Sequence, residues 1–205
     1  MADFGFVVDS SGSLKNEYNI EKEFVQAIVD TFKLSTASSS ARAALVLFSR
    51  TAHLEIKFSD YANTAAFKAA VAKLPLLGST TRIDKALQVA YKEMFNVSNG
   101  ARKGIQKVLI LMTDGKQTVE IDSVDLALAI KPIHEAGIKV IVIGIGPGVD
   151  PVELASIAED PKDIYYAKDF NQLRSSNFIT NITEASCALP GEYCALFVIV
   201  KTFNP

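Results

Sequence analysis

The stretch "FVVDSSGSLKNEY", residues 6–18, sets an apolar run against one carboxylate and a series of hydroxyls. The run at residues 4–8 predicts a strand that is covered on both faces. In an extended segment every second side chain points the same way, so Asp9, Ser11 and Ser13 are expected to converge. Serine, glycine and aspartate are also common turn residues. The stretch alone is therefore compatible with a simple strand end, and the rest of the chain must decide.

Outward from this stretch, apolar segments alternate with amphipathic ones, a pattern typical of repeated strand–helix units. Strands are expected at residues 4–8, 43–48, 53–58, 108–112, 139–145 and 164–167. Helices are expected at residues 19–33, 64–74, 82–95 and 123–136, after the N-cap Asp150, and finally after the N-cap Asp169. Residues 53–58 alternate polar and apolar, as an edge strand does. We expect Pro132 to bend or interrupt its helix.

These segments predict one α/β domain built on a doubly wound, mostly parallel central sheet. The sheet has one antiparallel edge strand and is covered by helices on both faces. We expect the domain to occupy residues 1–186, followed by a C-terminal extension of unknown role at residues 187–205. The first strand begins almost at once after Met1, so no signal peptide is visible and we expect a processed or partial chain.

The composition is that of a globular protein with a sizeable core: 205 residues, 49% hydrophobic and 21% charged. The formal net charge is −2 and the lysines and arginines are scattered. Without a basic stripe, a nucleic-acid partner is not expected. The apolar runs are too short to span a bilayer, so membrane insertion is not expected either.

Cysteine and asparagine residues give weaker signals. Cys187 and Cys194 bracket a Pro-Gly turn and are candidates for a local disulfide. The alternatives are two free thiols, or a Cys187 whose partner lies outside this sequence. Asn96 and Asn181 each begin an N-glycosylation pattern, although about one such pattern is expected by chance.

Three loops at the carboxyl ends of strands carry hard oxygen groups. The first holds Asp9, Ser11 and Ser13, the second is Gly-Ser-Thr-Thr at residues 78–81, and the third holds Asp114. Two carboxylates with several hydroxyls suit Mg²⁺, which prefers oxygen ligands and keeps some of its water. A Ca²⁺ site would recruit more carboxylates, and the lack of His and Cys argues against Zn²⁺.

Three motifs in these loops resemble those of the von Willebrand factor A domain: Asp-x-Ser-x-Ser, Gly-x-Thr and Thr-Asp-Gly. The segments "VIVIGIGPGVDPVELASIA" (140–158) and "DFNQL" (169–173) resemble its extracellular-matrix branch, of the collagen VI and matrilin type. The resemblance covers residues 3–185 and implies a metal-ion-dependent adhesion site. Its metal ligands by position are Asp9, Ser11, Ser13, Thr80 and Asp114. Thr81 is the rival to Thr80, which is preferred because it completes Gly-x-Thr and leaves Thr81 to cap the helix.

The resemblance implies a secreted adhesion module, part of a longer extracellular chain. Bound Mg²⁺ or Mn²⁺ would bridge to an acidic side chain of a protein ligand, such as a collagen-like matrix protein, a cell-surface protein or a second copy. Expected contacts at the rim of the site are Lys15, Ser79, Arg82, Lys116 and Gln117. The alternative is a structural matrix-assembly module whose contacts do not need the metal.

An enzymatic role is not expected. Haloacid dehalogenases place a second aspartate two residues after the first, where this chain has Ser11. The only histidines, His53 and His134, are expected at the surface, so no hydrolase triad is supported. The glycine-rich residues 144–148 lack the Lys-Ser/Thr ending of a phosphate-binding loop.

Overall fold

The computed structural model describes residues 2–187, and these form a layered α/β fold around a six-stranded sheet. The sheet has the order β3-β2-β1-β4-β5-β6. Its strands are β1 (Ala2–Asp9), β2 (Arg42–Phe48), β3 (Ala52–Ile56), β4 (Gln106–Thr113), β5 (Lys139–Ile145) and β6 (Ile164–Ala167). Only β3, at the edge, pairs antiparallel with its neighbour. The predicted fold class is confirmed.

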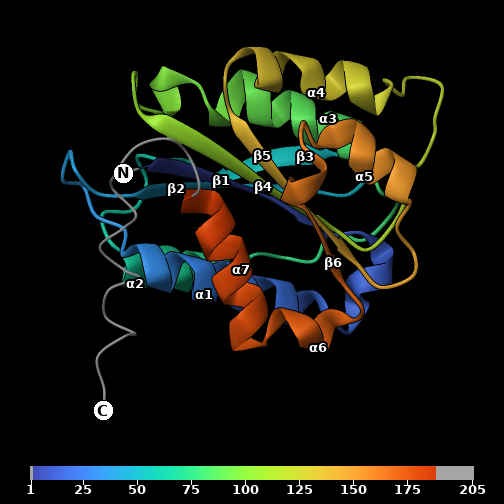
Figure 1. Cartoon of the computed structure of the whole chain (residues 1–205), viewed down its shortest axis with the longest axis horizontal. Coiled ribbons are helices and arrows are strands. Elements are labelled where there is room, and N and C mark those ends of the chain that lie inside the picture. The colour runs from blue at the N-terminus through green and yellow to red at the C-terminus, as the bar shows by residue number, and fades with distance from the viewer. Residues whose placement is uncertain (1, 188–205) are drawn as a thin grey trace.

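Helices cover both faces of the sheet (Figure 1). On one face lie α1 (Tyr18–Phe32), α2 (Thr64–Ala72), α6 (Phe170–Leu173) and α7 (Ser176–Cys187). On the other lie α3 (Ile83–Val89), α4 (Leu126–Glu135) and α5 (Pro151–Ile157). The sheet therefore separates two hydrophobic cores, one on each of its faces.

The central strand β1 serves both cores, and all eight of its residues are buried. Phe4, Phe6 and Val8 pack into the core beneath α1, whereas Val7 points into the core beneath α3. This alternation follows from the two-residue period of a strand. It explains why the first strand is a continuous apolar run, since neither of its faces meets solvent.

Helix ends differ from the sequence prediction more than strand ends do. The predicted helix at 82–95 is α3 followed by a π-helical turn, Ala90–Met94. The last predicted helix is in fact two helices, because the Asp169 side chain caps only α6 and the Ser175 hydroxyl accepts a bond from the Phe178 amide at the start of α7. Pro132 lies inside α4 and does not interrupt it, while a bend at this residue stays a prediction.

The helix α4 also starts later than predicted, because Asp125 and not Ser123 provides its N-cap. The Asp125 carboxylate accepts hydrogen bonds from the amides of Ala127 and Leu128. Asp150 caps α5 with Pro151 in the first turn, as predicted. Between Ala2 and Cys187, none of the helices is both long and apolar enough to cross a membrane.

The predicted C-terminal extension lies almost wholly outside the described residues. Cys187, the last of them, is disulfide-bonded, while Cys194 and the rest of residues 188–205 are not described. The two glycosylation candidates, Asn96 and Asn181, are both exposed, and their modification stays a prediction. His53 is exposed as expected, whereas His134 is half-buried, with its Nε2 atom buried and unpartnered among the described groups.

Candidate metal centre

The site begins where strand order reverses, at the adjacent carboxyl ends of β1 and β4. Asp9 is the last residue of β1 and is fully buried. One carboxylate oxygen accepts a hydrogen bond from the Ser11 amide at 2.8 Å, and the other accepts one from the Thr113 hydroxyl, also at 2.8 Å. The carboxylate of Asp9 is thereby fixed at the carboxyl ends of both central strands, β1 and β4.

The hydroxyls that follow Asp9 connect the first loop to the third. The Oγ atoms of Ser11 and Ser13 are 3.1 Å apart, and Ser13 Oγ donates to Asp114 Oδ1 at 3.0 Å. The structure therefore brings together four residues that the sequence predicted to converge: Asp9, Ser11, Ser13 and Asp114. Their oxygens come from segments more than a hundred positions apart in the chain.

Burial disfavours the charged form of both carboxyl groups, Asp9 and Asp114, unless a counter-charge is near. Burial raises the pKa of Asp9 from 3.8 to about 6, although hydrogen bonds from Thr113 and Ser11 oppose the rise and the charge of Asp114 adds to it. Burial also raises the pKa of Asp114, against the hydrogen bond from Ser13 and with a contribution from Glu17. A cation placed between the two carboxylates would relieve this electrostatic cost.

The second loop is fastened to the first through its backbone. The Gly12 amide donates to the Ser79 carbonyl at 2.9 Å, and the Gly78 amide donates to the Ser10 carbonyl at the same distance. A Cβ added at Gly12 would lie only 3.3 Å from the Ser79 oxygen, so glycine permits this close approach. The loop that carries Thr80 and Thr81 therefore lies directly beside the loop that carries the serines.

The structure places the hydroxyls of Thr80 and Thr81, the two candidate metal ligands of the second loop, in different surroundings. Thr81 does not cap α3: the N-cap residue is Arg82, and no side chain caps the helix. The Thr81 hydroxyl instead lies beside the third loop, 3.6 Å from the position that a Cβ on Gly115 would take. The Thr80 hydroxyl is buried and has no hydrogen-bond partner among the described groups. The capping role expected of Thr81 was therefore wrong, while the Gly-x-Thr match of Thr80 is unaffected.

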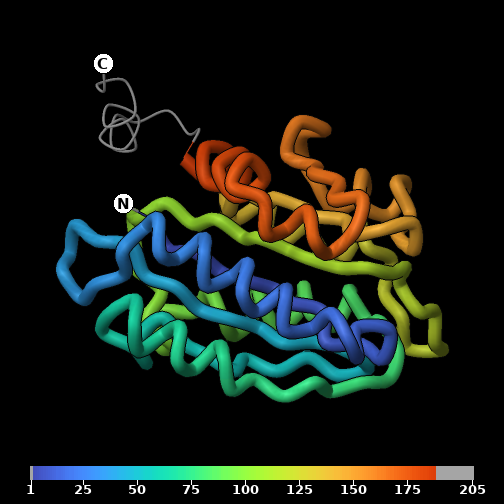
Figure 2. Tube along the Cα trace, turned by 90° about the horizontal axis from the view of Figure 1, so that it is seen from below, coloured from blue at the N-terminus to red at the C-terminus, as the bar shows by residue number. Residues whose placement is uncertain are grey.

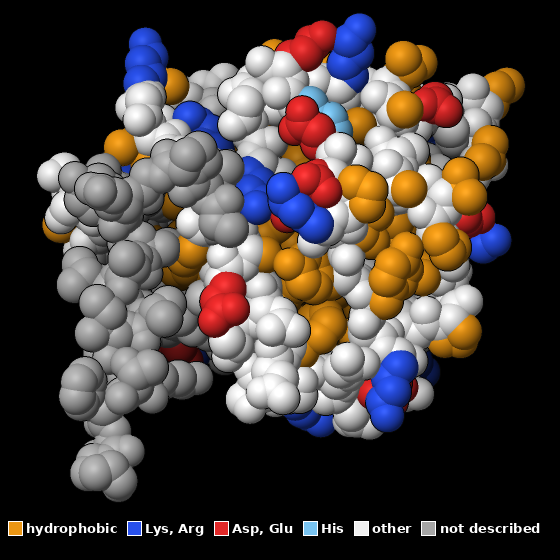
Figure 3. Space-filling model, in the orientation of Figure 1, with side chains coloured by type: hydrophobic (Ala, Val, Ile, Leu, Met, Phe, Trp, Pro, Cys, Tyr) orange, Lys and Arg blue, Asp and Glu red, His pale blue; other side chains and the backbone are white. Residues whose placement is uncertain are grey.

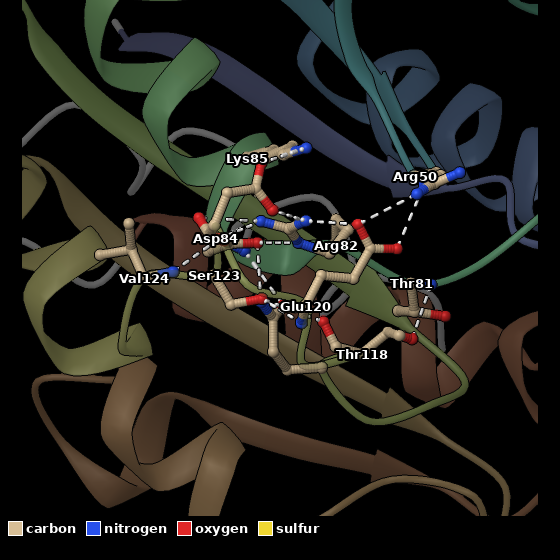
Figure 4. A network of polar contacts seen from close by, with 11 residues as sticks. Arg50, Thr81, Arg82, Asp84, Lys85, Thr118, Glu120, Ser123 and Val124 are labelled. Atoms are coloured by element: carbon tan, nitrogen blue, oxygen red, sulfur yellow. Dashed lines mark hydrogen bonds and ion pairs between the residues drawn. The ribbon is translucent and has the colours of Figure 1, made fainter.

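Arg82 joins the second and third loops through an arginine clasp, formed by Arg82 with Asp84, Glu120 and Asp122 (Figure 4). The guanidinium is fully buried and makes two 2.9 Å hydrogen bonds to the Asp84 carboxylate. It also donates to Glu120 at 3.1 Å and to Asp122 at 2.7 Å. Such two-pronged pairs fix geometry as well as charge.

The clasp is extended by contacts on either side of it. Asp84 also accepts hydrogen bonds from Gln117 Nε2 and the Val124 amide. Burial alone would raise the pKa of Asp84, but the bonds from Arg82, Gln117 and Val124 outweigh it and lower the pKa to about 2. The Thr118 amide donates to the Thr81 carbonyl at 2.7 Å. The loop after Asp114 is thus tied to the start of α3.

The predicted rim residues divide into three kinds. Lys15, Ser79 and Lys116 are exposed, although Lys116 forms an ion pair with Asp150 at 3.2 Å. Gln117 is half-buried and holds Asp84. The structure does not support a rim role for Arg82, because its charge is neutralised inside the clasp and no part of it reaches solvent.

The donor set fits a hard cation with few charged ligands. Among residues 2–187 there is no group of three or more His, Cys, Asp or Glu side chains that could hold a metal ion. A cation at this edge would therefore depend on two carboxylates and on hydroxyl oxygens. Oxygen-only coordination with retained water is what Mg²⁺ and Mn²⁺ accept.

Sequence reasoning missed Glu21, which lies on the buried side of α1. It is fully buried, and neither of its carboxylate oxygens has a hydrogen-bond partner among the described groups. Burial raises its pKa well above 4.5, and the charges of Asp9 and Asp114 raise it further. The available signal was its position three residues before Phe24, on the apolar stripe of the helix.

Comparisons with known proteins agree with the fold described above. Residues 3–179 match the model of the von Willebrand factor type A domain. Matrilin-1 of Bos taurus is 31% identical over 202 residues, which are 97% of this chain and 35% of that protein. Integrin alpha-M of Mus musculus is 27% identical over 181 residues, 85% of this chain and 15% of that protein. The chain thus spans about a third of the length of the matrilin relatives.

A solved structure provides a relative with metal at the corresponding motif. Proximal thread matrix protein 1 of the mussel byssus, solved with a zinc-occupied MIDAS motif (the metal-ion-dependent adhesion site), superposes with a TM-score of 0.80. The two are 28% identical, and the match covers 91% of this chain and 46% of that one.

Proposed function

Because the chain belongs to the von Willebrand factor type A domain family, we propose that its carboxyl-edge site binds a divalent cation and through it a protein partner. The proposed ion is Mg²⁺ or Mn²⁺, and the proposed partner group is an acidic side chain. The observation that carries this proposal is the continuous series of oxygens from Ser11 through Ser13 to Asp114, beside the buried carboxylate of Asp9.

We assign the metal ligands, directly or through water, to Asp9, Ser11, Ser13, Asp114 and one hydroxyl of the second loop. Thr81 is the better choice for that hydroxyl, because its Oγ1 lies beside Gly115, the neighbour of Asp114. Thr80 is the alternative, since its hydroxyl is buried and unpartnered.

The number of carboxylates explains why a partner would bind. A bound dication would supply an electron-poor centre with room for one more oxygen ligand. Two aspartates at most neutralise it, and the serine and threonine hydroxyls add no charge. A partner carboxylate is then favoured, because hard cations prefer anionic oxygen. Additional acids in place of Ser11 and Ser13 would saturate the charge and remove the attraction.

The proposed setting is extracellular, and the proposed role is that of a binding module and not of an enzyme. Matrilin-1, collagen alpha-1(XII) and integrin alpha-M are all among the similar proteins. A collagen-like matrix protein, a cell-surface protein or a second copy of the chain are the partner classes that this supports. A structural module whose contacts need no metal is the less favoured alternative.

Thermal melting with and without metal tests the site. A ligand that binds only the folded state stabilises it, by about 2.7 kcal/mol at a hundredfold excess over its Kd. The melting temperature should rise with Mg²⁺ or Mn²⁺, and Asp9→Asn should abolish the rise.

Asp3→Asn is the matched control for this experiment. Asp3 lies on the same strand, is equally buried, and pairs with Arg102 at the opposite end of the sheet. Its variant should melt lower than the wild type but keep the full metal-induced rise. A rise that survives Asp9→Asn would refute the assignment.

A further inference from the structure

The loop that follows the third metal-site loop has an unusual arrangement of side chains. Between Thr118 and Ser123, charged and aliphatic residues alternate. Glu120 and Asp122 both pair with Arg82, but only Glu120 is half-buried, whereas the Asp122 side chain is 56% exposed and also pairs with Lys85. The side chain of Val119 is 81% exposed and that of Ile121 is fully exposed. The two aliphatic residues are thus more exposed than the carboxylates beside them, which reverses the usual order.

This exposure is not the result of a loose loop. The Glu120 amide donates a hydrogen bond to the Ser123 hydroxyl at 2.7 Å, and the Thr118 amide donates one to the Thr81 carbonyl. The guanidinium of Arg82 pairs with Glu120 at 3.1 Å (Figure 4) and with Asp122 at 2.7 Å. With Glu120 and Asp122 both paired to Arg82, the segment presents Val119 and Ile121 to solvent in a defined orientation.

A third exposed aliphatic side chain lies next to this loop. Val152, in the first turn of α5, is 78% exposed. Val119 and Val152 both line a hollow of about 400 Å³ between the loop, α4 and α5. Figure 3 shows hydrophobic side chains gathered on the side of the molecule where α5 and this loop lie. Among the described large hydrophobic residues, Ile121, Val119 and Val152 have the greatest exposure.

These side chains adjoin the metal centre. Only Gly115, Lys116 and Gln117 separate Asp114 from Thr118. Figure 2 shows the loop at residues 115–125 at the same end of the molecule as the turn at Gly12–Lys15, which contains Ser13. A partner whose carboxylate reaches the metal therefore has its neighbouring residues within reach of the loop.

We propose that Val119, Ile121 and Val152 form an apolar contact surface that binds aliphatic side chains next to the acidic residue of the protein partner. The proposal rests on the proposed function, because the metal site defines where the partner binds. The partner segment would thus carry Glu or Asp together with aliphatic residues at a fixed spacing. A metal at the site would accept any accessible carboxylate. The apolar contact surface would then determine which of the acid-containing segments bind tightly.

A random peptide library displayed on phage tests this without knowledge of the natural partner. The library is bound to the wild-type domain in Mg²⁺ and eluted with EDTA, so that only metal-dependent peptides are recovered. The same selection is made on the double variant Val119→Ser/Ile121→Ser. Both substitutions are at exposed positions, and an unchanged Mg²⁺-induced rise in melting temperature shows that the variant keeps its metal site.

Both peptide pools should be rich in Glu or Asp, but only the wild-type pool should be rich in aliphatic residues at a fixed distance from the acid. A synthetic peptide from that pool should bind the double variant at least about tenfold more weakly, since each buried aliphatic side chain contributes about a tenfold gain in affinity. It should bind Val97→Ser as tightly as the wild type, because Val97 is exposed and precedes β4, at the opposite end of the strands from the metal site.

Two other outcomes are informative in different ways. Equal aliphatic content in the two pools would overturn the apolar contact surface while leaving the metal-dependent function intact. A wild-type domain that binds Mg²⁺ but yields no EDTA-eluted peptide would overturn the proposed partner chemistry, and the apolar contact surface with it.

Discussion

Thr80 and Thr81 are adjacent in the chain, but their hydroxyls have different surroundings. Thr80 Oγ1 is buried without a partner among the described groups, so replacing it with a methyl group removes an unsatisfied polar atom. We expect Thr80→Val to melt no lower than the wild type and to keep the metal-induced rise. Thr81→Val should fold but lose most of that rise, because it removes the hydroxyl beside Gly115.

The two valine variants serve as controls for each other, because each keeps the size and shape of threonine. Melting curves with Mg²⁺ and with EDTA measure both effects at once. If Thr80→Val loses the rise and Thr81→Val retains it, the ligand is Thr80, as the Gly-x-Thr pattern suggested.

Glu21 predicts a pH dependence of stability. Its pKa is raised by burial, so the folded protein holds a proton that the unfolded chain releases above about 4.5. The contribution of Glu21 to the free energy of unfolding must then fall as pH rises. The fall is about 1.4 kcal/mol per pH unit while Glu21 stays protonated in the folded state. Glu21→Gln, which mimics the protonated acid, should be free of this loss.

Urea unfolding of both proteins, from pH 4.5 up to neutrality, measures the difference directly. The variant should match the wild type at the acid end and become progressively more stable toward neutral pH. Glu23→Gln is the control, because Glu23 is on the same helix but is exposed and pairs with Arg174 at the surface. A difference between Glu21→Gln and wild type that is flat with pH would refute a protonated Glu21.

At the scale of elements, the arginine clasp connects two of the three loops that meet at the metal centre. We expect Arg82→Gln to cost about 3–5 kcal/mol of stability, because it leaves Asp84 buried without its charge partner. We also expect it to weaken Mg²⁺ binding by about tenfold, since the loops of Thr81 and Asp114 lose their common anchor. Titration calorimetry well below the melting temperature measures the second effect.

Arg102→Gln separates loss of stability from loss of positioning. Arg102 pairs with the buried Asp3 at 2.6 Å, at the opposite end of the sheet. This variant should also melt lower than wild type, but its Mg²⁺ affinity should be unchanged. Equal affinity in Arg82→Gln, Arg102→Gln and wild type would mean that the clasp only stabilises the fold.

Strands were easier to predict from the sequence than helix ends, for a physical reason. The bounds of β5 and β6 agree with the sequence prediction, because each is an apolar segment with polar or turn residues on both sides. Helix ends depend on which side chain provides the cap. Asp125 caps α4, so this helix starts three residues later than expected, and the Ser175 hydroxyl accepts a bond at the start of a new helix where one continuous helix was expected.

For the molecule as a whole, the converging oxygens were predictable and the charged core beside them was not. Asp9, Ser11 and Ser13 follow from extended geometry after one strand, and Asp114 from the end of its neighbour in the sheet. Arg82 was expected at the rim because it directly follows the second loop, and a fully buried arginine is rare. Its partners Glu120 and Asp122 lie about forty residues further along the chain, and no local pattern links them to it.

The central position of β1 has a consequence for how the protein is made. β1 pairs with β2 on one side and with β4 on the other, and the second pairing joins Asp3 to Lys107. A ribosome adds roughly 5–20 residues per second, so this strand waits about 5–20 s for its second neighbour. During that time the edge of β1 that will pair with β4 has unpaired N–H and C=O groups, beside apolar side chains that are not yet covered. We therefore expect chaperones to protect β1, the strand that ends at Asp9, while the rest of the chain is still being made.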